Sequence, residues 1–213
     1  MDAMNLNERD SQTENSALVA ACLQPSVWID WQDPKVFSCA QSLSVGVGDP
    51  LALVQRCYEF VRDEIPHSVD AQLTPITCRA SDVLRHGTGF CFAKSHLLAA
   101  LLRAHQIPTG LCYQRLRFNE NEADSPLSLH GLNAVYLPEY GWYRLDPRGN
   151  KPSVNAQFVP PVEQLAFSLQ HPGEADIPGI WPDPLPGVVT LLTRHCSVDS
   201  VIKALPEVEV PAL

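Results

Sequence analysis

The sequence has 213 residues, enough for one domain that buries a core of its own. Lys and Arg number 15 against 24 Asp and Glu, a net charge of −9, which argues against a protein that binds nucleic acid or an anionic membrane. The longest apolar run, 17–23, is far shorter than the roughly 20 residues of a membrane-spanning helix.

The cysteines and the amino terminus bear on the cellular compartment. Seven Cys at irregular spacing, with no Cys-x-x-Cys pair, do not indicate a disulfide framework. Residues 1–15 are polar and acidic, without the basic start and apolar stretch of a secretion signal. We therefore expect a cytoplasmic protein.

In chain order, residues 1–15 are expected to form a flexible tail. Apolar spacing and capping residues then predict helices over 35–43, 49–63, 80–86 and 90–105. The last of these is the best defined, because its Leu and Ala residues form a broad apolar face. Strands are predicted over 111–118, 129–137 and 141–145, the last two joined as a hairpin.

This order of helices followed by strands predicts an α+β fold, with helices packed on one face of an antiparallel sheet. We expect residues 16–150 to form the catalytic core. Eight of the 19 prolines fall between residues 152 and 186, so residues 151–213 are expected to be a Pro-rich extension packed on the core.

Cys91 follows Gly89-Phe90 and opens the best-defined helix. A helix amino terminus carries partial positive charge and unpaired N–H groups, and both favour a thiolate. The same N–H groups can bind the oxyanion of a tetrahedral intermediate. Cys91 is thus a candidate nucleophile, and the alternative is a buried structural thiol.

His130 starts one predicted strand of the hairpin, and Asp146 ends the other. Antiparallel pairing brings these two ends together, so a Cys–His–Asp triad can assemble, with the His as base and the Asp fixing its tautomer. The alternatives are an ordinary strand-end histidine and a turn-forming aspartate before Pro147.

Strand parity makes the triad a sharp prediction, because side chains alternate between the two faces of a sheet. A regular four-residue loop would put His130 and Asp146 on opposite faces. The triad therefore requires a loop of odd length or a bulge in one strand. The better solution is a three-residue loop, 138–140, with Leu137 opposite Gly141 and a positive φ at Tyr140.

Three blocks of the sequence resemble the transglutaminase-like cysteine enzymes. Residues 89–114, GFCFAKSHLLAALLRAHQIPTGLCYQ, resemble the nucleophile helix of that family, and 129–150, LHGLNAVYLPEYGWYRLDPRGN, its His strand, Gly-Trp hairpin and Asp-Pro end. Residues 58–68, YEFVRDEIPHS, resemble the helix that precedes the core. Cys91, His130 and Asp146 fall on the three catalytic positions of the family in the right order.

The resemblance implies a papain-like core and acyl chemistry on an amide or peptide through a thioester, without a cofactor. Animal transglutaminases use an upstream Trp at the oxyanion, but this chain has no Trp between Trp31 and Trp142. Gln72, Phe90 and Tyr143 are the candidates for oxyanion or substrate contacts.

We expect hydrolysis, as in a protease or amidase, with a peptide or small amide as the substrate. The alternatives are an amine acyltransferase with the same triad and a non-catalytic binding module of the same fold. The spacing of His86, Cys91 and His96 matches no zinc pattern. Lys94 is expected either to lower the pKa of the thiol through its charge or to point to solvent. Arg148 is expected either to line a substrate cleft or to be solvated, and we favour the second.

Overall fold

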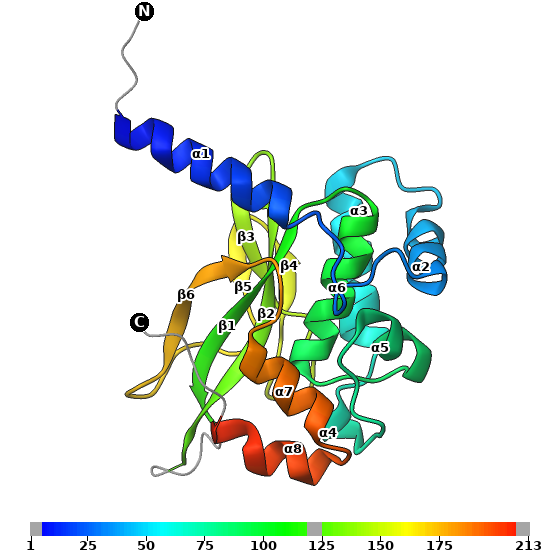
Figure 1. Ribbon diagram of the computed structural model, residues 1–213, viewed down its shortest axis with the longest axis vertical. Helices are drawn as coiled ribbons and strands as arrows, with labels where there is room; N and C mark the ends of the chain where they lie inside the picture. Colours follow the sequence, from blue (N-terminus) through cyan, green and yellow to red (C-terminus); the bar gives the residue numbers. More distant parts are fainter. Residues whose placement is uncertain (1–5, 119–124, 208–213) are drawn as a thin grey trace, which may run out of the picture.

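The computed structural model describes residues 6–118 and 125–207, and shows a layer of helices against one face of an antiparallel sheet (Figure 1). The helices that precede the sheet in the chain are α1 (Leu6–Ala21), α2 (Pro34–Ser44), α3 (Pro50–Glu59) with its π-helical continuation (Phe60–Glu64), α4 (Ser68–Ala71), α5 (Ala80–His86) and α6 (Cys91–Ala104). The predicted α+β class is confirmed.

The helix boundaries follow from the capping residues. Asp49 caps α3, where its side chain accepts hydrogen bonds from the amides of Leu51 and Ala52, and Pro50 takes the first helical position. Gly87 ends α5 with a φ of +63°. By contrast, α1 begins at Leu6, inside the segment expected to be a tail.

The main sheet has the order β3-β2-β1-β6. Its strands are β1 (Thr109–Arg117), β2 (Leu127–Leu137), β3 (Gly141–Leu145) and β6 (Ala175–Trp181). A separate hairpin joins β4 (Gln157–Val159) to β5 (Val162–Gln164), and the chain closes with α7 (Pro186–Arg194), α8 (Val198–Ala204) and a short 3-10 turn (Leu205–Glu207).

The segment after residue 150 thus contributes one strand to the main sheet, because β6 pairs with β1 and forms an edge of the sheet. Pro178 lies inside β6, where a missing N–H is tolerated because an edge strand has one unpaired side. The position of this strand next to β1 could not be read from local patterns.

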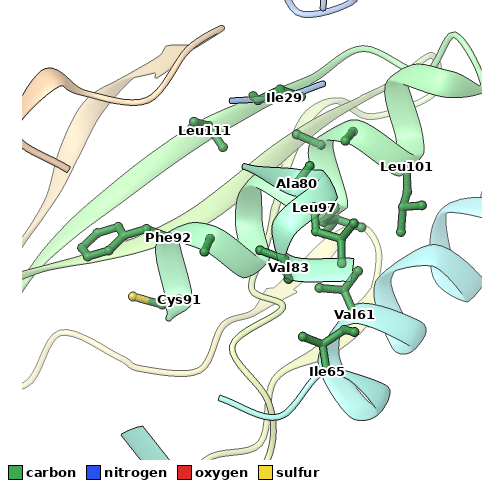
Figure 2. Packing of buried hydrophobic residues seen from close by; sticks show 14 of the residues in the cluster. Ile29, Val61, Ile65, Ala80, Val83, Cys91, Phe92, Leu97, Leu101 and Leu111 are labelled. Atoms are coloured by element: carbon green, nitrogen blue, oxygen red, sulfur yellow. The ribbon is translucent and has the colours of Figure 1, made fainter. Parts of the chain in front are cut away.

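Helix α6 lies at the centre of the core and is buried over its whole length. Figure 2 shows Leu97 of this helix packed with Val61 and Val83, and Cys91 at the amino-terminal end of the helix. Because every turn of α6 is enclosed, the backbone that positions Cys91 is rigidly supported. Among the described residues, no helix is long and apolar enough to cross a membrane.

Candidate active site

Cys91 is the first residue of α6 and lines a cleft of about 360 Å³. The thiol is only slightly open to solvent, since Cys91 is 7% exposed. Phe90 supplies no side-chain hydrogen bond as the N-cap residue, so the first amides of α6 depend on other partners. The structure therefore places the thiol at the positive end of a buried helix, as the sequence predicts.

His130 and Asp146 meet across the β2–β3 hairpin, with 2.7 Å between His130 Nε2 and Asp146 Oδ2. Leu137 pairs with Gly141, the register of the predicted three-residue loop. The predicted positive φ at Tyr140 is wrong, however, because it falls on Gly141 at +74°. Gly141 takes this conformation without a Cβ penalty and is still the first paired residue of β3.

His130 also interacts with Cys91. Burial lowers the pKa of His130, but the Asp146 carboxylate and the Cys91 side chain outweigh burial and raise it to about 10. Because Asp146 occupies Nε2, the nitrogen left for the thiol is Nδ1. The imidazole therefore lies between the Asp146 carboxylate and the Cys91 side chain.

Asp146 is fully enclosed and is fixed by three hydrogen bonds. Its carboxylate accepts from the backbone amides of Arg148 at 3.0 Å and Ala166 at 3.2 Å, besides His130. Burial raises the pKa of Asp146, but the charge of His130 and these hydrogen bonds hold it below its usual value. Asp146 thus stays ionised and can orient His130.

His67 is a cleft residue that the sequence analysis missed. Its Nε2 accepts a hydrogen bond from the Cys91 backbone N–H at 3.1 Å, and its ring meets Phe90 edge-on at 5.7 Å. An isolated bridge between His67 and Gly89 brings the two segments together. Such a bridge leaves no periodic pattern, and only the general enrichment of His in active sites could have suggested it.

Of the three residues predicted to contact the oxyanion or the substrate, the structure places one in the cleft and two outside it. Phe90 lines the cleft. Gln72 is not among the residues that line it, and its side-chain amide donates to the Val69 carbonyl at 2.7 Å. Tyr143 is buried in the core, where its hydroxyl donates to the Val162 carbonyl and its ring packs on Phe158. Of the three, the structure brings only Phe90 to Cys91.

The expectation that Lys94 points to solvent is wrong. The side chain is buried and its ammonium group donates to the carbonyls of Arg62 and Ile65. Burial lowers the pKa of Lys94 to about 7, with a smaller contribution from the positive charge of Arg148.

The favoured expectation that Arg148 is solvated is wrong, because its side chain lines the cleft and the residue is only 7% exposed. Its guanidinium binds both carboxylate oxygens of Asp70, at 2.6 and 3.2 Å, and Lys151 reaches the same carboxylate at 3.0 Å. Asp70 therefore forms part of one wall of the cleft together with two basic side chains. The described residues contain no group of three or more His, Cys, Asp and Glu that could hold a metal ion.

The cleft is also lined by aliphatic side chains, from Leu116 of β1, Leu129 of β2, Ile202 of α8 and Leu205. A substrate that reaches Cys91 therefore meets both charged and aliphatic side chains.

The family model of the transglutaminase-like superfamily matches residues 38–147, just over half of the chain. A search of curated proteins found no match.

Among solved structures, a candidate cysteine protease from Cytophaga hutchinsonii is 18% identical, with a TM-score of 0.50 over 61% of this chain and 42% of that one. The periplasmic domain of TgpA from Pseudomonas aeruginosa is 22% identical, with a TM-score of 0.47 over 62% of this chain and 47% of that one. The matched region is thus less than half of either solved structure, and the likeness concerns the fold.

Proposed function

The chain belongs to the transglutaminase-like superfamily, and on that premise we propose that it is a cysteine enzyme that cleaves an amide or peptide bond through a thioester. The observation that carries the proposal is the arrangement of three side chains in one cleft. Cys91 lies at the tip of α6, and His130 beside it is held by Asp146 at 2.7 Å. A binding module would not need this arrangement.

The proposed cycle begins with a thiolate and an imidazolium. With a pKa of about 10, His130 is protonated at neutral pH, and a positive charge beside Cys91 favours the thiolate. The Cys91 sulfur attacks the carbonyl carbon and forms a tetrahedral intermediate. When the C–N bond breaks, His130 gives its proton to the leaving amine, and the acyl group stays on the sulfur.

The second half of the cycle releases the acyl group. Neutral His130 takes a proton from water, the hydroxide attacks the thioester carbon, and the C–S bond breaks to return the thiolate and the imidazolium. An amine in place of water would give a new amide by the same steps. Hydrolysis is the better proposal because water reaches the cleft without a dedicated site, whereas an amine must be bound in competition with it.

Asp146 has two tasks in this cycle. Its carboxylate accepts from Nε2, so that Nδ1 faces the thiol, and its negative charge stabilises the imidazolium. Since Asp146 is itself held by the Arg148 and Ala166 amides, the imidazole has little freedom to turn.

Intact-mass spectrometry tests the proposal directly. The protein is mixed with a library of peptide esters and amides, quenched in acid within seconds, and compared with Cys91→Ala. We expect an adduct with the mass of the acyl group on the wild type only, and release of free acid over time. If added amine diverts most of the product to the amide, the acyltransferase alternative replaces hydrolysis. A lack of any Cys91-dependent adduct would contradict the enzyme proposal.

A further inference from the structure

The backbone amide of Ala166 and the ring of Phe167 both reach the proposed triad. The Ala166 amide donates to Asp146 Oδ2 at 3.2 Å, the same carboxylate oxygen that accepts from His130 Nε2 at 2.7 Å. The Phe167 ring meets the imidazole of His130 edge-on, with 5.1 Å between the ring centroids and 89° between the ring planes. Both residues lie beyond residues 38–147, which match the family model. The segment that follows β5 therefore forms part of the surroundings of His130.

The Phe167 ring is also held by a basic side chain. The guanidinium of Arg148 lies over the ring, 5.6 Å from its centroid, which is the distance of a cation–π contact. Arg148 is itself fixed by its two hydrogen bonds to the Asp70 carboxylate, at 2.6 and 3.2 Å. Because the amide of the preceding residue, Ala166, is bound to Asp146, a displacement of Phe167 would disturb contacts of its ring and of the adjoining backbone.

The contact with Phe167 restricts a motion that the hydrogen bond to Asp146 leaves open. That hydrogen bond fixes one nitrogen of His130, but the imidazole plane can still tilt about it. A phenyl ring packed edge-on against the imidazole opposes this tilt. The phenyl ring also takes room beside a buried ion pair that water would otherwise fill, and the exclusion of water strengthens a charged hydrogen bond.

We propose that Phe167 is a positioning residue that acts on the reaction through His130. Its ring keeps the imidazole in the plane in which one nitrogen binds Asp146 and the other faces Cys91. The ring takes part in no bond that forms or breaks. This inference rests on the proposed function, since His130 is the acid and base of that reaction.

Two other roles for the Phe167 ring lead to different expectations. The ring packs on a small apolar cluster of Val154, Ala156 and Ala166, separate from the main core, and a role in stability alone would act in the same way without His130. The ring also lines the cleft, and a role in substrate contact alone would raise KM without changing the ionisation of Cys91.

The pH midpoint for alkylation of Cys91 by iodoacetamide is the main measurement. The midpoint reports the ionisation of the thiol, and a change in access to the thiol alters the limiting rate instead. Phe167→Leu removes the ring but stays apolar, whereas Phe167→Tyr keeps the ring and can place its hydroxyl in the cleft. Both variants are expected to fold, because the ring belongs to a small cluster outside the main core. Each is compared in the wild type and in His130→Gln.

Phe158→Leu is the matched control, because it also removes a phenyl ring from an apolar environment. The Phe158 ring packs against Tyr143 with 5.4 Å between the centroids, and Phe158 does not line the cleft. We expect this substitution to lower stability, measured by urea unfolding, and to leave the alkylation midpoint and kcat as in the wild type.

For Phe167→Leu we expect the alkylation midpoint to rise by about 0.5–1 pH unit, a three- to tenfold change in the ionisation constant, because the imidazolium is less well placed beside the thiolate. We expect kcat to fall by about 10-fold with KM little changed. Phe167→Tyr should restore most of both values. In the His130→Gln protein, Phe167→Leu should leave the midpoint where it is.

Four results would overturn the assignment. These are an unchanged or lowered midpoint in Phe167→Leu, an equal shift in the His130→Gln protein, a loss confined to KM, and no recovery by Tyr. Failure of the proposed function is distinct from all four. In that case the wild type forms no acyl adduct, while the alkylation midpoints still decide whether Phe167 acts on His130.

Discussion

His130 and Asp146 reach each other because the loop between β2 and β3 has three residues. Leu137 pairs with Gly141, and in the same register Asn133 pairs with Leu145. Asp146, the next residue after Leu145, therefore lies on the same face of the sheet as His130. The resulting contact is 2.7 Å. One more residue in a regular loop would have turned the carboxylate to the other face of the sheet, away from Cys91.

We expect Cys91→Ala to abolish turnover and to leave the fold stable, because a small apolar side chain fits the tip of α6. Cys112→Ala removes a buried thiol, 4% exposed, from the sheet and should cost about 1 kcal/mol in the free energy of unfolding without loss of chemistry. Steady-state rates and urea unfolding measure the two effects. Wild-type turnover in Cys91→Ala would rule out this nucleophile.

The charge state of His130 predicts a pH dependence of stability. Its pKa is raised to about 10 in the folded protein from an ordinary value of about 6.5. The folded protein therefore binds more protons than the unfolded one between these values, and the contribution of His130 to stability is fully present below pH 6.5 and is lost as pH rises towards 10.

Urea unfolding of the wild type and of His130→Gln across pH 6–10 measures this contribution. The difference in the free energy of unfolding should shrink as pH rises. Lys94, whose lowered pKa of about 7 has the opposite effect on stability, is present in both proteins and cancels in the difference. A difference that is constant over the whole range would show that the folded protein does not favour the imidazolium.

Asp146→Asn keeps the size of the side chain but removes its charge and one acceptor. The amide can no longer satisfy His130 and the two backbone amides together, so the imidazole is free to turn or to change tautomer. We expect kcat to fall by about 10²–10⁴-fold with KM little changed. A loss confined to KM would instead place Asp146 in substrate binding.

The sequence predicted the helices and strands that are marked by signals within the element itself, such as apolar spacing, capping residues and turn residues. Helix α6, the three strands β1–β3 and the hairpin register all follow from such signals. A type I turn followed by a bulge residue predicts the positive φ at Tyr140, the last residue of the loop. Gly141 instead takes it at the first paired position, where glycine has no steric penalty.

What escaped prediction depends on contacts between distant segments. His67 reaches Cys91 through a single bridge to Gly89, and β6 joins β1 across some sixty residues. Arg148 forms an ion pair with Asp70, which lies in α4, far from Arg148 in the sequence. None of these pairs produces a repeat that a sequence pattern can show, so the contact between His130 and Asp146 could be predicted but its surroundings could not.

Gly141 gives a test of the hairpin. A Cβ at this position meets no atom within 4 Å, so Gly141→Ala is opposed only by the φ of +74°. We expect a loss of about 1 kcal/mol in the free energy of unfolding and little change in turnover, because the loop keeps its length. Gly48→Ala, which also meets open space but has no positive φ, should be nearly neutral. Equal effects at both positions would contradict the backbone argument.

Gly131 sets the distance between the strand that carries His130 and the helix that carries Cys91. A Cβ on Gly131 would lie 2.6 Å from Phe92 Cδ1 and 3.2 Å from Phe92 Cα, so β2 and α6 would have to move apart beside the site. We expect Gly131→Ala to cost about 1–3 kcal/mol in stability. It should also lower kcat/KM by about 10²-fold, since a displacement near 1 Å separates the thiol from the imidazole.

A double-mutant cycle with Phe92→Ala identifies the cause. Alanine has no Cδ1, the atom nearest to the new methyl group, so Gly131→Ala should be less harmful in the Phe92→Ala protein than in the wild type. Part of the lost alkylation rate at Cys91 should return with it, because the strand can again approach the helix. Strictly additive effects on stability and on alkylation would show that the close packing of Gly131 on Phe92 does not set the distance between Cys91 and His130.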